Sequence, residues 1–183
     1  SDDYLLSVEN LSLFGLGVSQ YYSTYTNRSA PHHIYAGSQD QGFQRSNGDD
    51  GGILEFDQSV SGDYGHLVSG DGGETLWCNY PGFTMYYDNP QIDQGGETID
   101  FPGNGHLWLA PLMADPDNPN VAYLGGGGLN NGNHLIKLTA SAWSISYEEN
   151  PNSFSGTVSA MAISPIDYDY WYVLTETGKF YHS

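Results

Sequence analysis

Acidic residues beside glycine are the side chains of this sequence that could do chemistry. Asp40 lies in "QDQGFQR" and Asp71 in "SGDGGETLW". A glycoside hydrolase needs two carboxylates, about 5 Å apart for retention or about 6.5–9.5 Å apart for inversion. If the chain is an enzyme, Asp40 and Asp71 are its candidate catalytic pair. The alternative is that each carboxylate caps a turn by accepting backbone hydrogen bonds, as Asp beside Gly commonly does.

Other polar side chains occur in similar segments rich in Gly, Asn and Gln. Carboxylates and amides form hydrogen bonds with sugar hydroxyls, and the apolar faces of sugars stack on rings such as Phe43, Trp77 or Trp108. The pattern therefore favours a glycan as ligand. The candidate ligand-binding residues are Gln39, Asp40, Arg45, Asp71, Glu74, Asp93, His106 and Asn130, with Glu176 beside them.

Two further motifs suggest a metal ion and attached glycans. Asp115, Asp117 and Asn118 in "ADPDNPN" could offer oxygen ligands to Ca²⁺, the one cofactor that the sequence suggests. The run lacks the Gly and the distal Glu of an EF-hand loop, so a turn stiffened by proline is the alternative. Asn10 in "NLS" and Asn27 in "NRS" match the N-glycosylation pattern, which is compatible with a secreted chain.

The composition excludes several classes of partner. Among 183 residues, four Lys and Arg face 22 acidic residues, giving a formal charge of −18. Such a surface repels nucleic acid and anionic membranes and favours cations. There is no long apolar run, so no membrane insertion is expected. Cys78 is the only cysteine, which excludes an internal disulfide and indicates a buried structural thiol.

The elements that must position these side chains are short strands. Runs rich in Val, Ile, Tyr, Trp and Thr recur between clusters of Gly, Pro, Asn and Asp, which predicts an all-β chain of antiparallel strands. These runs recur as a unit of strand, turn with Pro or Asp, strand with Tyr, Gly-containing turn and strand. A tyrosine is expected at the equivalent position of the second strand in each unit, and these tyrosines are Tyr35, Tyr86, Tyr123 and Tyr172.

The unit recurs at intervals averaging near the ~40–45 residues of a four-stranded propeller blade. The sequence therefore predicts about four blades, over approximately 14–65, 66–105, 106–150 and 151–183, the last lacking a strand that is supplied from elsewhere. Candidate fourth strands are "GILEFDQSV", "LWL" or its neighbours, and "AWSISYEE". The alternative is a β-sandwich.

Two structural expectations follow from a propeller. The Gly run in "VAYLGGGGLNNGNHLIKL" is expected at a hairpin tip, where positive φ angles are needed. The loop entering a blade and the loop between its second and third strands emerge on one face, so the candidate ligand-binding residues are expected along one rim. Four blades rarely close a ring, which indicates a segment of a larger propeller with open strand edges.

The order of "HIYAGSQDQGFQRS", "VSGDGGETLWCNYPGFTMYY" and "AMAISPIDYDYWYVLTETGKFYHS" resembles β-propellers of the BNR or Asp-box class in secreted bacterial proteins, related to sortilin-type and xyloglucanase-type propellers. The Asp-box pattern S-x-D-x-G-x-T-W is matched by Ser69, Asp71, Gly73 and Thr75, with Trp77 one position late. The resemblance implies an extracellular or cell-surface location. Sialidases of this class need three arginines and this chain has two, which disfavours that activity.

The leading hypothesis is a non-catalytic extracellular module that binds a glycan or a neighbouring protein chain, or that forms a structural part of a surface assembly. The alternative is a xyloglucanase-like glycoside hydrolase with paired carboxylates. A third hypothesis is a fibre subunit that self-assembles through its open strand edges.

Overall fold

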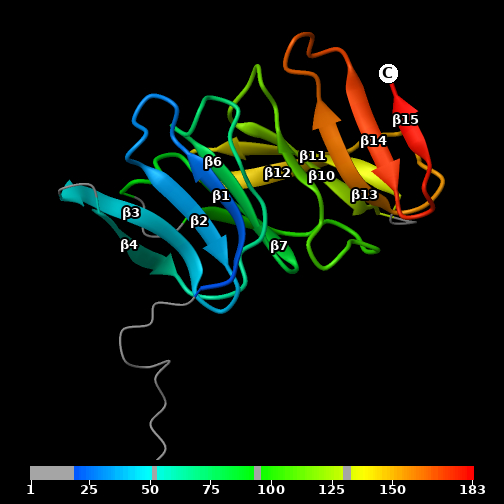
Figure 1. Cartoon of the computed structure of the whole chain (residues 1–183). Coiled ribbons are helices and arrows are strands. Elements are labelled where there is room, and N and C mark those ends of the chain that lie inside the picture. Colours follow the sequence, from blue (N-terminus) through cyan, green and yellow to red (C-terminus); the bar gives the residue numbers. More distant parts are fainter. Residues whose placement is uncertain (1–18, 51–52, 93–95, 130–132) are drawn as a thin grey trace, which may run out of the picture.

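The predicted all-β architecture is confirmed. The computed structural model describes residues 19–50, 53–92, 96–129 and 133–183, and these contain strands and turns but no helix. Figure 1 shows the strands grouped into four antiparallel sheets that stand side by side. With no helix among the described residues, no helical segment there could cross a membrane.

Each sheet is built from one continuous stretch of chain. The first contains β1 (Tyr21–Thr26), β2 (Ile34–Ser38), β3 (Gly42–Asp50) and β4 (Ile53–Val60). The second contains β5 (Leu67–Val68), β6 (Leu76–Tyr80), β7 (Phe83–Tyr87) and β8 (Glu97–Asp100). The third contains β9 (Leu112–Ala114), β10 (Val121–Gly127), β11 (His134–Ser141) and β12 (Ser144–Glu149). The fourth has three strands, β13 (Val158–Ile163), β14 (Trp171–Thr175) and β15 (Phe180–His182).

The sheets are arranged as blades of a partial β-propeller. Their first strands, β1, β5, β9 and β13, are successive neighbours, and the remaining strands of each sheet follow in chain order. The chain therefore runs outward from the axis in each blade and returns to the axis through the connection to the next blade. This is the radial arrangement of a propeller rather than the two facing layers of a sandwich.

Two of the three candidate fourth strands are correct. "GILEFDQSV" overlaps β4 and "AWSISYEE" overlaps β12. "LWL" is not a strand: the fourth strand of the second sheet is β8, and Leu107–Leu109 lies in the connection to the third sheet. Thr98 and Asp100 are the exposed positions of β8, and Ile99 is its only hydrophobic residue, so the strand carries too little hydrophobic pattern to be found in the sequence.

The prediction that a tyrosine lies at the equivalent position of each second strand is correct for three sheets and wrong for the second sheet. Tyr35, Tyr123 and Tyr172 lie in β2, β10 and β14, the second strands of their sheets. Tyr86 lies in β7, a third strand, and the equivalent residue of the second sheet is Trp77 in β6. The first strand of the second sheet, β5, has two residues and no recognisable pattern in the sequence. The sequence repeat of the second sheet is therefore aligned one strand too late.

The hydrophobic cores lie between the blades. One core joins Trp77 and Tyr86 to Leu124 and Ile136, between the second and third sheets. The corresponding core between the first and second sheets includes Cys78, which is fully buried. Burial raises the pKa of the Cys78 thiol, which keeps it protonated and agrees with the predicted structural role.

The glycine run serves close packing as well as the turn. Gly125, Gly126 and Gly127 belong to β10 and are buried, so only the following residues form the connection to β11. Gly126 has a φ of 83° at a register shift in the β10–β11 pair. A Cβ on Gly125 would meet Val158 of the fourth sheet, and one on Gly127 would overlap the ring of His106. The run thus lies at the predicted connection between the second and third strands and includes a positive φ angle, but its first three glycines belong to β10 and also allow close packing.

Candidate functional site

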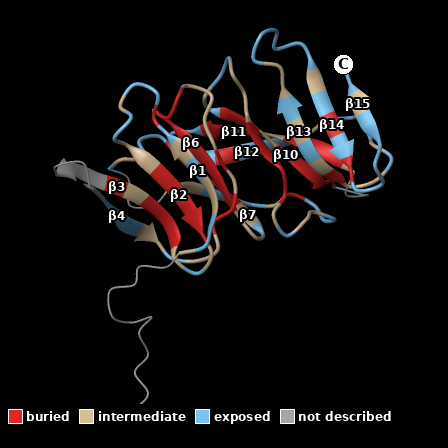
Figure 2. Ribbon diagram, viewed as in Figure 1, coloured by how far each residue is buried: buried red, intermediate tan, exposed pale blue. Residues whose placement is uncertain are grey.

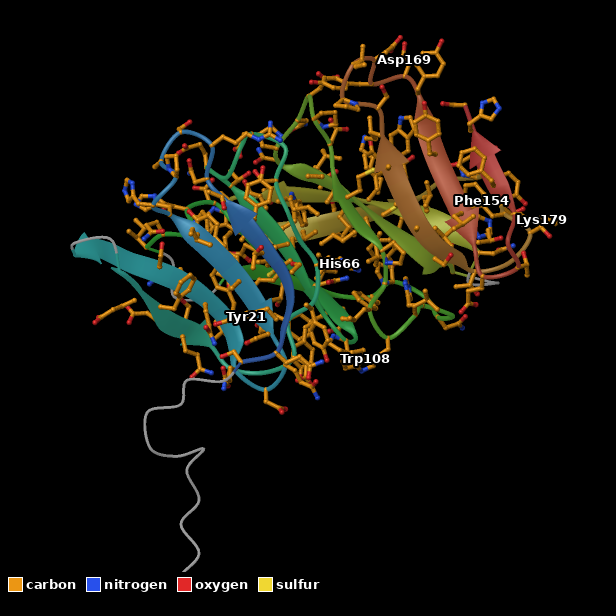
Figure 3. The ribbon with its side chains drawn as sticks, viewed as in Figure 1. Tyr21, His66, Trp108, Phe154, Asp169 and Lys179 are labelled. Carbon is orange, nitrogen blue, oxygen red and sulfur yellow. The ribbon has the colours of Figure 1, made fainter. Side chains whose placement is uncertain are left out.

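The loops gather at two opposite ends of the sheets. The connections between first and second strands share one end, which we call the Asp71 end: Arg28 N donates to Gly72 O at 2.7 Å, and Trp77 Nε1 donates to Pro119 O at 2.9 Å. The connections between second and third strands, and those between sheets, share the other, which we call the Asp40 end. Figure 3 shows Asp169 of the Asp71 end and Trp108 of the Asp40 end on opposite sides of the molecule.

Asp71 holds a tight turn between β5 and β6. Its Oδ1 accepts hydrogen bonds from Ser69 Oγ at 2.8 Å and from Thr75 N at 3.0 Å. Gly72 and Gly73 have φ angles of 85° and 106°, which glycine adopts without a steric cost. Partial burial raises the pKa of Asp71, but the hydrogen bonds from Thr75, Ser69 and Gly73 outweigh burial and lower it below its usual value. An ionised carboxylate acts here as the centre of a turn.

Asp40 occupies the tight turn between β2 and β3, at the other end. It is exposed, has a φ of 61°, and its backbone N donates to Asp63 Oδ1 at 2.8 Å. The five residues of β2 alone separate the two ends by about 16 Å, at about 3.3 Å per residue. This exceeds the ~9.5 Å that an inverting pair spans. The structure therefore does not bring Asp40 and Asp71 together as a catalytic pair.

The expected single rim is divided between the two ends. Glu74 lies beside Asp71, where its side chain accepts a hydrogen bond from Asn27 Nδ2 at 3.3 Å. Arg45 also reaches toward this end and donates to Pro90 O at 3.1 Å. Gln39 lies at the Asp40 end and accepts a hydrogen bond from Tyr22 Oη at 2.9 Å. The division arises because Ser69–Thr75 joins a first and a second strand, whereas sequence reasoning placed it with the other class of loop.

His106 lies at the Asp40 end but packs into the structure. Its Nε2 lies 2.9 Å from Pro102 O, and its ring centroid is 4.8 Å from that of Phe101. Burial lowers the pKa of His106, although hydrogen bonding to backbone groups acts in the opposite direction. The ring fills the space beside Gly127, so its evident role is structural.

The candidate Ca²⁺ ligands form a turn of their own. Asp115 Oδ1 accepts hydrogen bonds from Asp117 N at 2.9 Å and Asn118 N at 3.0 Å, and Asp115 Oδ2 accepts one from Tyr123 Oη at 2.9 Å. Within the described residues, no three His, Cys, Asp or Glu side chains come together as metal ligands. The geometry fits the proline-stiffened turn better than a Ca²⁺ site, because both Asp115 oxygens already accept hydrogen bonds.

Asn27, a predicted glycosylation site, is buried and makes hydrogen bonds through its side chain. Asn27 is 3% exposed, and its amide donates to Gly73 O at 3.0 Å and accepts from Ser29 N and Ala30 N, both at 2.8 Å. A glycan on Asn27 would have to replace the bond to Gly73, and the buried position leaves it no room. Asn10, Asp93 and Asn130 lie outside the described residues.

A cavity at the Asp71 end was not anticipated from the sequence. It has a volume of about 480 Å³ and lies among the first strands of all four sheets and the loops that follow them. Most of the side chains that line it are apolar, the lining also exposes polar atoms, and Arg28 is the one charged side chain among the described residues lining it. The cavity suits an apolar group with a hydrogen-bond-accepting end rather than a metal ion. Correct alignment of the four first strands would have revealed it. The lining residues are Tyr25, Arg28, Leu67, Val68, Ser69, Gly70, Leu112, Met113, Ala114, Pro116, Met161, Ala162, Ile163, Ser164, Pro165 and Tyr168.

Comparison with known proteins supports the fold alone. No family model and no curated protein sequence matches the chain. The chain is similar to the β-propeller domain of Cps50 (Swd1) from Myceliophteria thermophila, with a TM-score of 0.65 and 12% identity over 89% of this chain and 51% of that chain. It is also similar to a chain of the Mitotic Checkpoint Complex, with a TM-score of 0.60 and 15% identity over 90% of this chain and 47% of that chain. The chain thus spans about half the length of these structures and has the fold of a partial β-propeller.

Proposed function

We propose that the chain is a non-catalytic part of a larger extracellular β-propeller and acts as a binding or structural module, with a glycan or a neighbouring protein as partner. The observation that carries this proposal is an apolar sheet face at one end of the row of blades. We call it the open face of the fourth sheet. It carries Ala160, Ala162, Tyr172, Leu174 and Phe180, with His182 beside Tyr172.

Alternation along β14 defines the open face. Val173 and Thr175 are buried on the side toward the third sheet, whereas Tyr172 and Leu174 point the other way and are 38% and 40% exposed. Phe180 pairs with Leu174 across the sheet, and its ring stacks on that of Tyr172 at 6.1 Å. Figure 2 shows the contrast between these exposed strands and the buried central strands of the other sheets.

The same position is covered in the other three sheets. Tyr35 lies in the core with the second sheet, and its Oη donates to Gly73 O at 3.4 Å. Trp77 packs against the third sheet and donates to Pro119 O. The ring of Tyr123 lies 4.5 Å from that of Trp171 in the fourth sheet. Tyr172 is the fourth member of this series, so the partner that fits its face is a further blade.

A copy of the first sheet fits the open face less well than a sheet with a wholly apolar face. The face that the first sheet turns away from the second is mixed, because alternation with Tyr35 and Phe43 places Ser38, Gln44 and Ser46 on it beside Tyr21 and Phe56. These polar groups bond among themselves and to the backbone, as in Gln44 Nε2 to Ser38 Oγ at 3.4 Å. The corresponding faces of the second and third sheets are apolar. The open face therefore favours a blade of that apolar kind.

The Asp71 turn supports a narrower assignment to the Asp-box class. The carboxylate accepts bonds from Ser69, Glu74 and Thr75, so the residue types of the pattern are used for one compact turn. Membership of that class, and the extracellular location that it implies, are parts of the proposal. The charge of −18 agrees with a surface that stays soluble in a medium of high ionic strength.

The open face is tested by sedimentation of the chain in about 1 M NaCl, where charge repulsion is screened beyond about 3 Å. We expect two open faces to cover each other, so that the chain associates as its concentration rises. Leu174→Asp should remain monomeric, and the matched control Tyr147→Asp, which changes an exposed residue of β12, should associate like the original chain. Association that Leu174→Asp leaves unchanged would contradict the proposal.

The non-catalytic part is tested by the release of reducing sugar from a soluble neutral β-glucan. We expect no release, because the predicted carboxylate pair is not formed. Release that disappears in Asp40→Asn, with an unchanged circular dichroism spectrum, would restore the glycoside hydrolase hypothesis.

A further inference from the structure

A second cavity lies away from the axis, between the outer strands of the second and third sheets at the Asp71 end. Its volume is about 470 Å³, within the ~300–1,000 Å³ of ligand pockets in proteins. Tyr86 and Asp88 come from the end of β7, Gly96 and Glu97 from the start of β8, and Asn120 from the residue before β10. The opposite wall consists of Ala140, Ser141, Ala142 and Trp143 at the tip of the β11–β12 hairpin.

Trp143 is the exposed aromatic residue of the cavity lining. The side chain is 87% exposed, although it is a large aromatic residue. Its hairpin is held in place because Ser141 Oγ donates to Ser144 O at 3.0 Å and lies 3.1 Å from Ser144 Oγ. An aromatic face presented on a fixed hairpin can receive a ligand without a large ordering cost.

The other walls are polar. Tyr86 is buried against Trp77, with ring centroids 4.8 Å apart, so it offers its hydroxyl and not its ring face to the cavity. That hydroxyl donates to Asn120 Oδ1 at 2.6 Å and also interacts with the side chains of Thr75 and Asp88, so the Asn120 NH₂ group is the site that this pair offers to a ligand. Burial, and then the negative charge of Asp88, raise the pKa of Tyr86 to about 12, so the hydroxyl remains protonated at neutral pH.

We propose that this cavity binds a neutral saccharide, with one sugar face on Trp143 and its hydroxyls bonded to Asp88, Glu97 and Asn120, which Tyr86 holds in place. Hydroxyl, amide and carboxylate groups beside one aromatic plate match a molecule with many hydroxyls and an apolar face. Asp88 and Glu97 repel acidic sugars, and the described lining contains no Lys or Arg to bind them. Asp88, Glu97 and the Trp143 ring would also attract a cationic side chain. The neutral amide of Asn120 favours the saccharide, and calorimetric titration distinguishes the two ligands.

This inference rests on the proposed binding role and names its ligand class. The test is calorimetric titration of the chain with cellohexaose, mannohexaose and hexagalacturonate. We expect binding of at least one neutral hexasaccharide and none of the acidic one. Trp143→Ala should weaken that binding by about tenfold or more. Tyr170→Ala is the matched control, because Tyr170 is also an exposed aromatic residue but lies in the β13–β14 connection of the fourth sheet, and it should bind as the original chain does.

Three results would overturn the inference: neither neutral hexasaccharide binds, Trp143→Ala binds them as well as the original chain, or hexagalacturonate binds equally well. Binding of a lysine-rich peptide that Trp143→Ala abolishes, without binding of sugar, would make the cavity a cation site instead. Each variant is first checked by circular dichroism. These results are independent of the sedimentation of Leu174→Asp, so failure of the sugar site is distinguishable from failure of the proposed module.

Discussion

At the scale of single residues, two aspartates of similar sequence context have different roles. Asp71 accepts several hydrogen bonds as a carboxylate, whereas Asp40 is exposed and lies in a left-handed turn conformation. We expect Asp71→Asn to lower the free energy of unfolding by about 1–3 kcal/mol, because an amide replaces a charged acceptor. Denaturant titration measures this change.

The matched control is Asp40→Asn, which should change stability by less than about 0.5 kcal/mol, since asparagine also tolerates a positive φ. Equal losses of unfolding free energy in Asp71→Asn and Asp40→Asn would show that the Asp71 carboxylate does not stabilise its turn.

Two half-buried histidines, His66 and His106, predict sensitivity to acid. Burial lowers the pKa of both His66 and His106 in the folded protein below the ordinary value of 6.5. Below pH 6.5 the unfolded chain therefore binds more protons than the folded chain, and the free energy of unfolding falls as the pH falls. At lower pH, protonation of Asp71 removes a further contribution, because its folded pKa lies below the usual 3.8.

Denaturant titrations between pH 7.5 and pH 5 test the histidine effect. His66→Gln should show a shallower decrease than the original chain, because one titrating group is absent. A stability that increases on acidification to pH 5 would contradict the assigned directions.

At the scale of elements, β10 meets the connection between the second and third sheets through glycine. A methyl group on Gly127 would overlap the His106 ring. We expect Gly127→Ala to cost about 1–3 kcal/mol of unfolding free energy, the usual range for overpacking. The double variant His106→Ala/Gly127→Ala should be more stable than the sum of the two single changes predicts, by about 1 kcal/mol or more. Thermal or denaturant unfolding of the four proteins gives this coupling, and simple additivity would show that the two residues do not compete for space.

The elements were more predictable from sequence than the positions of loops. The alternation and aromatic content of β2, β10 and β14 gave strands at Tyr35, Tyr123 and Tyr172. The two-residue strand β5 and the polar strand β8 have almost no pattern of their own, and they exist because neighbouring strands supply their hydrogen bonds. Missing β5 placed the Asp71 turn at the wrong end of the blade and so created the false catalytic pair.

The cavity between the outer strands of the second and third sheets could not have been found in the sequence. Asp88, Glu97, Asn120 and Trp143 come from two sheets, and only the packing of β8 near β12 brings them together. In the sequence, Trp143 reads as one more hydrophobic residue of a strand. Its 87% exposure at a hairpin tip is the feature that distinguishes it, and exposure depends on the tertiary structure.

At the scale of the whole molecule, the net charge of −18 opposes compactness. Exposed acids gather at the Asp71 end, including Asp117, Asp167 and Asp169. We expect a rise from about 0.05 M to about 0.5 M NaCl to increase stability by about 1 kcal/mol, or Tm by about 2–4 °C, because screening weakens this repulsion. Calorimetry in the two salt concentrations measures the shift.

The triple variant Asp117→Asn/Asp167→Asn/Asp169→Asn is the matched control. It keeps an oxygen acceptor at each position while removing three charges, so its gain from salt should be smaller. An equal or larger gain would place the repulsion elsewhere on the surface.

Tyr35 and Trp77 each pack against the sheet that follows their own in the sequence, which gives folding of the chain a direction. During synthesis, Tyr35 cannot form its hydrogen bond to Gly73 O until the Ser69–Thr75 turn has been made. Trp77 in turn cannot form its hydrogen bond to Pro119 O until the connection between β9 and β10 has been made. Tyr123 likewise is covered by Trp171 of the fourth sheet. We therefore expect the sheets to become stable in chain order during synthesis, because each of these rings is covered by residues that follow it in the sequence.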